Sequence, residues 1–364
     1  MNNKRSYDYY VNSSDSDSDS NIDEVSKKIK GNTPTKNCKN KLCNHKLNSK
    51  MVTPSQIEIK SIQDLIDLGK KYHCKNFKTH KNLDLKILHN LIDPLENFDK
   101  MIGMKNVKEN IISQVLYFLQ GFNNWDEMLH VVITGSPGVG KTELAKKIGA
   151  IYKELGILST GEFYKVSRAD LIAEYLGQTA IKTTKTVEKC RGGIMFIDEV
   201  YSLSNGDVSD HYAKECIDTL NELLSTTKDF LCIIAGYEND VENCFFALNS
   251  GLKRRFSFKY NLEGYTSEEL LEIMKQKMDK DGWKFENQET TQKCGELFHK
   301  NMSKFKNFGG DIETFYLQCK IQHSSRLPDK IKSLSYQDIK NGYDVYIKHR
   351  KSQFDREPPY GLYI

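Results

Sequence analysis

The sequence predicts an α/β fold in which a parallel sheet with flanking helices is followed by a smaller all-helical domain. Short runs of consecutive apolar residues alternate with helical patterns as far as about residue 262, as expected of buried parallel strands. A glycine-rich loop joins one of these runs to a helix, and a pair of acids ends another. After Tyr265 only helical patterns follow, which predicts the second domain.

The composition is that of an ordinary soluble protein. Of the 364 residues, 28% are charged and 38% hydrophobic, and no apolar run approaches the roughly 18 residues that a membrane span needs. No secretory signal is recognisable, and the nine scattered cysteines are typical of reduced thiols. We therefore expect a cytoplasmic protein without membrane association. The net charge of +4 is too small to indicate nucleic acid by itself.

Residues 1–55 predict a disordered, low-complexity tail. Ser13–Ser20 alternates serine with aspartate, and a stretch rich in lysine and asparagine follows, so neither segment can bury a core. The alternating run is typical of a solvated tail or of a substrate for an acid-directed kinase. Cys38, Cys43 and His45 have the residue types of half a zinc site, but no further ligands follow at a standard finger spacing.

A phosphate-binding loop is the most specific motif. Gly135–Glu143 reads GSPGVGKTE, which matches G-x-x-x-x-G-K-T, between the apolar run Val131–Ile133 and a helical pattern over Glu143–Lys153. Glycines let backbone amides approach phosphate oxygens, and the helix N-terminus adds partial positive charge. Lys141 would reach the β- and γ-phosphates and Thr142 would hold Mg²⁺. The residues expected to bind the nucleotide here are Gly135, Ser136, Pro137, Gly138, Val139, Gly140, Lys141 and Thr142. The alternative is a simple glycine turn.

Two acids after a later strand predict hydrolysis. The apolar run Ile194–Ile197 ends in Asp198 and Glu199, and the end of such a strand is expected beside the phosphate-binding loop. Asp198 would hold Mg²⁺, largely through water, and Glu199 would act as the general base for the attacking water. The alternative is a core strand that happens to end in two acids.

Further elements complete the predicted fold. We expect strands over 163–166 and 230–235, and helices over 168–190, 209–226, 266–280, 291–305, 311–323 and 335–350. The first of these helices is broken near Tyr175-Leu176-Gly177. Residues 56–95 predict a short helical N-terminal segment, and an apolar stripe follows between residues 107 and 119. In Leu252–Phe258 basic residues meet aromatic ones, as in a nucleic-acid patch or a subunit contact.

Five tracts together resemble one family. They are GSPGVGKTE, VSRADLIAEYLGQTA, GGIMFIDEVYSL, IIAGYEND and NSGLKRRF. From about residue 96 to 350 the chain resembles the CbxX/CfqX branch of AAA+ ATPases, which includes the red-type Rubisco activases. The resemblance implies a RecA-like P-loop NTPase domain over 96–262 and a helical lid over 263–352, and we expect a C-terminal tail over 353–364. It also implies a homo-oligomeric ring, a hexamer, with ATP bound between subunits.

The resemblance also implies roles for single residues. Arg255 matches the arginine finger supplied to a neighbouring subunit, with Arg254 as the alternative, and Lys141 and Glu199 complete the catalytic set. Asp99–Met104 matches the segment that lines the adenine pocket, and Ile102 and Gly103 are the expected contacts. The central-pore loop would be Tyr175-Leu176-Gly177, whose aromatic side chain grips a substrate chain; the alternative is a tyrosine packed in a helical core.

Two positions depart from the wider AAA+ pattern. Tyr237 stands where many members have a polar sensor, often asparagine, and the tract Phe308–Ile312 lacks the lid arginine. The leading prediction is ATP hydrolysis to ADP and phosphate, with Mg²⁺, to remodel an unknown protein partner. The alternatives are a nucleic-acid-handling factor related to clamp loaders and helicases, or an ATP-binding scaffold with weak hydrolysis. No helix-turn-helix or zinc-finger signature supports nucleic acid, and nothing in the sequence points to Rubisco.

Overall fold

The computed structural model describes residues 59–71, 79–80, 83–124, 127–175, 177–204, 210–326 and 331–354. Contacts divide the chain into two compact units, Met1–Asn48 and Ser49–Ile364, and all of the described residues belong to the second. The expectations for the N-terminal tail, for Cys38, Cys43 and His45, and for residues 355–364 therefore lie outside the described residues.

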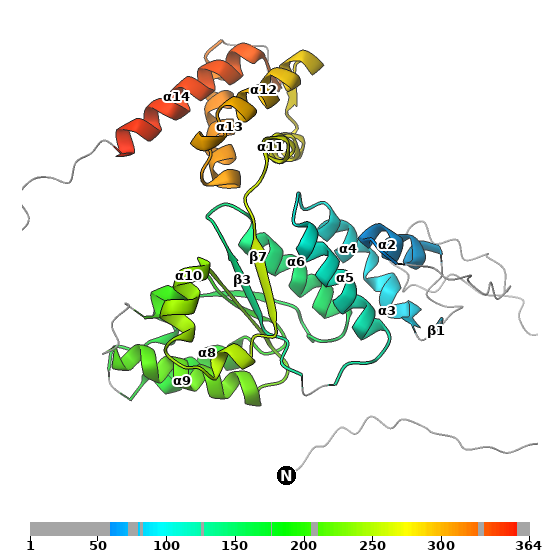
Figure 1. Cartoon of the computed structure of the whole chain (residues 1–364), viewed down its shortest axis with the longest axis vertical. Helices are drawn as coiled ribbons and strands as arrows, with labels where there is room; N and C mark the ends of the chain where they lie inside the picture. The colour runs from blue at the N-terminus through cyan, green and yellow to red at the C-terminus, as the bar shows by residue number, and fades with distance from the viewer. Residues whose placement is uncertain are drawn as a thin grey trace, which may run out of the picture. The chain divides into compact units, whose positions relative to one another are not determined.

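A five-stranded, all-parallel sheet confirms the predicted fold class. Its strands are β3 (Val131–Gly135), β4 (Phe163–Val166), β5 (Ile194–Ile197), β6 (Leu231–Gly236) and β7 (Phe258–Leu262). They run in the order β4-β5-β6-β3-β7, and Figure 1 shows β3 and β7 side by side. Every strand therefore ends at the same edge, where Thr134 is opposite Gly236 and Ile197 is opposite Ile234.

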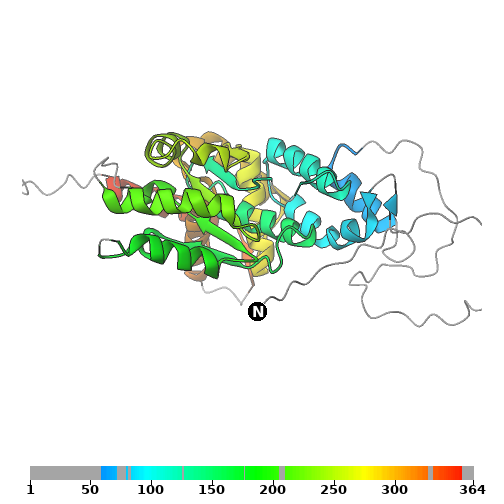
Figure 2. The same ribbon diagram turned by 90° about the horizontal axis from the view of Figure 1, so that it is seen from below.

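Helices cover both faces of the sheet. One face carries α2 (Ile62–Lys71), α3 (Leu85–Asn90), α4 (Ile92–Asp99), α5 (Lys105–Leu119) and α6 (Lys141–Glu154). The other carries α7 (Arg168–Leu171), α8 (Thr179–Lys189), α9 (His211–Thr226) and the π-helix η2 (Val241–Phe246). Figures 1 and 2 show α2 to α5, in blue and cyan, grouped together. Short elements complete this part: β1 (Thr79–His80), β2 (Leu83–Asp84), η1 (Val200–Leu203), α10 (Glu238–Asp240) and η3 (Leu252–Arg254).

Strand alternation divides the core between the two faces. Val131 and Ile133 of β3 pack with α2 to α6, whereas Val132 packs with the opposite helices. This is the period of two that an extended chain imposes, applied to a strand that is apolar on both sides. Among the described residues, no helix combines the length and the hydropathy needed to cross a membrane.

Two features of the sheet were not predicted from the sequence. Strand β7 was not predicted, because Leu252–Phe258 was interpreted as a basic and aromatic loop; yet from Phe258 to Leu262 the side chains alternate between buried and exposed. Strand β6 lies between β3 and β5, so the strand that ends at Asp198 is not the neighbour of the P-loop strand. Its acids still reach the same edge of the sheet.

The C-terminal part is helical, as predicted. It contains α11 (Ser267–Asp281), α12 (Gln288–Lys300), η4 (Met302–Lys304), α13 (Phe308–Ser324) and α14 (Tyr336–Phe354), with a parallel pair of short strands, β8 (Lys284–Phe285) and β9 (Ser333–Leu334). Helix α12 begins three residues earlier than expected, because the Asn287 side chain caps it by accepting a hydrogen bond from the Thr290 amide. We call Ser267–Phe354 the lid; its boundary near residue 262 stays a prediction.

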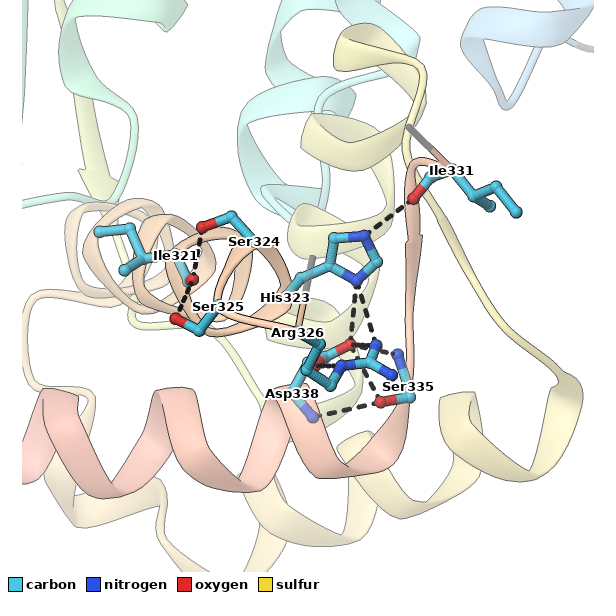
Figure 3. Close-up of polar contacts among 8 residues, drawn as sticks. All are labelled: Ile321, His323, Ser324, Ser325, Arg326, Ile331, Ser335 and Asp338. Carbon is cyan, nitrogen blue, oxygen red and sulfur yellow. Dashed lines mark hydrogen bonds and ion pairs between the residues drawn. The ribbon is translucent and has the colours of Figure 1, made fainter. Parts of the chain in front are cut away.

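A buried carboxylate joins the ends of α13 and α14 (Figure 3). Asp338 is 1% exposed and accepts hydrogen bonds from Arg326, His323 and Ser335. Burial alone would raise the pKa of Asp338, but these donors outweigh it and the pKa is lowered. A capping box starts α14, since the Ser335 amide donates to Asp338 and the Asp338 amide donates to the Ser335 hydroxyl.

Candidate functional site

A cavity of about 730 Å³ opens at the carboxyl edge of the sheet and is lined by residues of both the sheet domain and the lid. From the P-loop and the strand ends it is lined by Pro137, Gly138, Gly140, Lys141, Thr142, Glu143, Lys147, Asp198, Glu199, Tyr201, Gly236 and Tyr237. From the segment before α5 and from the lid side it is lined by Asn97, Lys100, Met101, Ile102, Tyr265, Ile273, Gln276, Lys277, Gly309, Gly310 and Glu313. The size is typical of a small-molecule site.

The P-loop has the conformation that its glycines allow. Gly138 and Gly140 adopt left-handed φ angles of 74° and 95°, which a side chain would oppose. Helix α6 begins at Lys141, so its N-terminus faces the cavity. The Lys141 ammonium donates to the carbonyl oxygens of Gly135 and Ser136, at 2.8 and 2.9 Å. The loop is therefore more than a glycine turn, because a cation and a helix N-terminus lie beside it. This combination binds phosphate.

The two acids after β5 lie in the same cavity as Lys141. Burial lowers the pKa of the Lys141 ammonium, and the nearby carboxylates of Asp198 and Glu199 oppose that shift. Asp198 also lies 3.5 Å from the ammonium of Lys165. Glu199 has a left-handed φ of 50°, a conformation that costs a residue other than glycine about 1–2 kcal/mol. Such strain persists only where the surroundings hold it, and it is common at functional sites.

Mg²⁺ fits this arrangement. Thr142 and Asp198, the two predicted ligands, both line the cavity. Mg²⁺ keeps several waters and usually takes only one or two protein oxygens beside the substrate phosphates. Among the described residues no group of three or more His, Cys, Asp or Glu side chains could hold a metal ion.

Two tyrosines that line the cavity were not predicted as site residues. Tyr237 follows β6, the strand between the P-loop strand and β5, and its ring centre is 5.8 Å from the Lys141 ammonium. Tyr201 stacks on Tyr237 with ring centres 6.2 Å apart. Tyr201 lies in the GGIMFIDEVYSL tract, but its contact with Tyr237 depends on the strand order.

The predicted adenine segment is only partly at the cavity. Met101 and Ile102 line it, whereas Gly103 does not; a side chain on Gly103 would instead meet the Glu269 carboxylate. The lid adds Gln276, whose side-chain amide donates to the Lys100 carbonyl oxygen at 2.9 Å. Sequence reasoning missed the lid residues of this wall because they carry no motif. These are Ile273, Gln276, Lys277 and Glu313.

Other predicted site residues lie elsewhere. Of the P-loop residues, Gly135, Ser136 and Val139 do not line the cavity. Arg255 is also outside it: its guanidinium donates to the Ser225 hydroxyl and to the Gly251 carbonyl oxygen, and Arg254 is exposed.

The predicted pore loop joins α7 to α8. Tyr175 is 67% exposed, so it is not the core tyrosine of the alternative interpretation. Gly177 has a left-handed φ of 79°, and Leu176 lies outside the described residues. The assignment of this loop to a central pore stays a prediction.

Comparison with known proteins places the chain in a family. Residues 131–263 match the model of the ATPase family associated with various cellular activities (AAA). A putative cfxQ-like protein of Acanthamoeba polyphaga mimivirus is 39% identical over 298 residues, which are 80% of this chain and 73% of that protein. Protein CbbX of Cereibacter sphaeroides is 35% identical over 51% of this chain and 62% of its own length. The chain thus spans less than two thirds of the latter relative.

One solved structure is a distant match. The AAA domain of FIGL-1 in complex with ADP matches with a TM-score of 0.49 and 16% identity, covering 71% of this chain and 90% of that domain.

Proposed function

Because the chain belongs to the CbxX/CfqX branch of the AAA ATPases, and is thus an ATP-binding protein and an ATP hydrolase, we propose that it uses hydrolysis to remodel a protein partner. One observation carries the proposal: a single cavity holds the Lys141 ammonium, the Thr142 hydroxyl and the carboxylates of Asp198 and Glu199. Those are the groups that phosphoryl transfer to water requires.

Each group has a distinct part in the proposed reaction. Lys141 binds the β- and γ-phosphates, and Thr142 and Asp198 would hold Mg²⁺, which supplies charge neutralisation when bound. Glu199 accepts a proton as a water oxygen attacks the γ-phosphorus. The bond from that phosphorus to the β–γ bridging oxygen breaks, and ADP and phosphate leave. The exposed position of Glu199 suits a base that takes its proton from water.

Remodelling would occur at the loop between α7 and α8. AAA+ proteins generally form oligomeric rings, and we propose a hexamer in which Tyr175 faces the central channel. An exposed aromatic ring offers a large contact area at a low cost in rotamer entropy. The left-handed Gly177 next to it allows the loop to turn sharply. The partner would be a flexible polypeptide segment that can enter the channel.

A second candidate is an ATP-binding scaffold with weak hydrolysis. The observation that favours it is the start of α13, where Gly309 and Gly310 line the cavity in place of the missing lid arginine. The nucleic-acid alternative is weaker, because Lys253 of the basic tract forms an ion pair with Glu242. A patch that binds a nucleic-acid backbone needs its positive charges free for phosphates.

The variant Glu199→Gln tests the proposal. It keeps the size and polarity of the side chain but removes the base, so ATP hydrolysis should fall by about 10²- to 10⁴-fold while ATP binding persists. Glu238→Gln is the matched control, since Glu238 is also an exposed glutamate shortly after a strand but does not line the cavity. Equal rates for the wild type and Glu199→Gln in the assembled protein would refute this role of Glu199.

The same variant tests the remodelling step. A protein that binds ATP without hydrolysing it should hold its partner, so pull-downs with Glu199→Gln in ATP should retain a protein that is released in ADP. Replacing Tyr175 by alanine in that background should abolish retention and leave nucleotide binding intact. Rapid hydrolysis without nucleotide-dependent capture of any partner would contradict the remodelling role and leave the ATPase role standing.

A further inference from the structure

The lid and the segment that leads into it make hydrogen bonds to two consecutive carbonyl oxygens of the P-loop. The Gly309 amide, in the first turn of α13, donates to the Gly138 carbonyl oxygen at 3.1 Å. The Tyr265 hydroxyl, in the segment between β7 and α11, donates to the Val139 carbonyl oxygen at 2.8 Å. Both distances are within the normal range for hydrogen bonds.

These two bonds fix the orientation of two P-loop peptide planes. In a trans peptide the N–H points opposite to the C=O, so a donor on the Val139 carbonyl turns the Gly140 amide away from that donor. The Gly309 bond does the same for the Val139 amide. Within the described part of the chain, neither the Val139 nor the Gly140 amide donates to another group. Gly138 and Gly140 both line the cavity, so the two peptides that carry these amides lie at its wall. We expect the amides to donate to phosphate oxygens there.

The start of α13 is shaped for this contact. Phe308 has a left-handed φ of 42°, which is unfavourable for a residue with a side chain. Its ring packs edge-on against Tyr265, with ring centres 6.0 Å apart, and it lies over Gly264, where an added Cβ would come within 2.3 Å of the ring. A Cβ on Gly309 would lie 2.8 Å from the Gly138 oxygen. Phe308 and Tyr265 thus pack as one unit, and only glycine at 309 allows the lid to approach the P-loop this closely.

We propose that the Tyr265 hydroxyl and the Gly309 amide are positioning groups that hold the P-loop amides in the orientation that binds the β-phosphate. Through the P-loop backbone they would couple the lid to the phosphates. The resemblance leads us to expect an arginine in Phe308–Ile312 that contacts the phosphates directly, and this chain has none there. The inference rests on the proposed function, since it concerns the same nucleotide site. Burial, and then the charge of Glu269, raise the pKa of Tyr265 to about 12, so the hydroxyl stays a donor at any working pH.

The test compares nucleotides that differ in their phosphates. Tyr265→Phe removes one hydroxyl and keeps the ring on Phe308, so affinity for ADP and ATP should fall about three- to tenfold, the usual weight of one hydrogen bond. Affinity for AMP, which has no β-phosphate, should be unchanged. Gly309→Ala should produce the same selective loss, because its Cβ pushes the lid from the Gly138 carbonyl. Competition against a fluorescent ATP analogue on the full-length protein measures all three affinities.

Tyr152→Phe is the matched control. Tyr152 also donates its hydroxyl, to the Gln114 side-chain oxygen at 2.9 Å, and it lies about three turns beyond Lys141 on α6. This variant should lose thermal stability but keep the wild-type preference for ADP over AMP. The positioning role is wrong if Tyr265→Phe lowers the affinities for AMP and ADP equally, or if it changes neither affinity. If the wild type itself binds no ATP, the proposed function fails instead, so the two failures are distinguishable.

Discussion

The ammonium of Lys141 lies 5.8 Å from the centre of the Tyr237 ring, which places an aromatic face beside the only lysine of the phosphate-binding motif. The Tyr237 ring also stacks on Tyr201. A cation over an aromatic face is attracted by the ring quadrupole, and the attraction is larger where water is partly excluded. Tyr237 is therefore placed to hold Lys141 in the cavity, a different part from that of a polar residue that orients water.

We expect Tyr237→Phe and Tyr237→Leu to differ. Phenylalanine keeps the ring and should leave the KM for ATP nearly unchanged. Leucine removes the ring and should raise KM by about two- to fivefold, equivalent to the 0.5–1 kcal/mol typical of an exposed cation–π contact. Steady-state ATPase kinetics measure the difference. If the phenylalanine variant is as impaired as the leucine variant, the hydroxyl rather than the ring is the important group.

A buried histidine predicts how stability depends on pH. His130 is 4% exposed, and its Nδ1 accepts a hydrogen bond from the Cys232 amide, so Nε2 carries the proton and donates to the Leu224 carbonyl oxygen. Burial lowers the pKa of His130 to about 4, although the bond to Leu224 opposes the shift. Below about pH 6.5 the His130 side chain therefore binds a proton in the unfolded chain, whereas in the folded protein it stays neutral until the pH is close to 4. Stability is complete above that pH and falls as the pH drops towards 4.

Urea unfolding at pH 7 and pH 5 should reveal this contribution. Between these values His130 alone should lower the free energy of unfolding by about 2 kcal/mol. The control is His130→Gln, which has no titrating group there and should lose correspondingly less stability over the same interval, whatever its stability at pH 7. A fall of equal size in both proteins would show that other groups cause the acid sensitivity.

The parts of the site that sequence predicted are those that lie close together in the chain. The P-loop conformation follows from Gly138, Gly140 and the helix after them, because the glycines and the helix start are consecutive. The acids of β5 were predicted for the same reason, since Asp198 and Glu199 directly follow an apolar run. In each case the local pattern determines the local geometry, and the parallel sheet then brings the two strand ends to one edge.

The residues that were missed reach the site through long-range packing. Tyr201 touches Tyr237 only because β6 lies between β3 and β5, and strand order is not written in any local pattern. Gln276 lines the cavity because α11 packs near the segment that precedes α5. Strand β7 spans only five residues, Phe258–Leu262, and directly follows a basic tract that is itself typical of a loop, so its short alternation is a weak local signal.

Arg255, the residue predicted to be the arginine finger, can be tested by substitution and in mixed assemblies. Arg255 is half-buried and its guanidinium bonds to Ser225 and Gly251, outside the cavity of its own chain. If a neighbouring subunit receives it, Arg255→Ala should lose hydrolysis by about 10³-fold or more while ATP binding persists. Arg254→Ala should retain most activity if Arg255 is the finger, and the two results should be reversed if Arg254 is.

Mixing two inactive variants separates a finger that acts in trans from an arginine that acts within its own subunit. Arg255→Ala keeps Glu199 but lacks the finger, and Glu199→Gln keeps the finger but lacks the base. In a mixed ring, an Arg255→Ala site next to a Glu199→Gln subunit has both groups, so the mixture should regain ATPase activity that neither variant has alone. At equal amounts about half of the Arg255→Ala sites would have such a neighbour, which bounds the recovery near a quarter of the wild-type rate. A mixture that exchanges subunits but stays inactive would mean that Arg255 acts within its own chain or only supports the loop around Gly251.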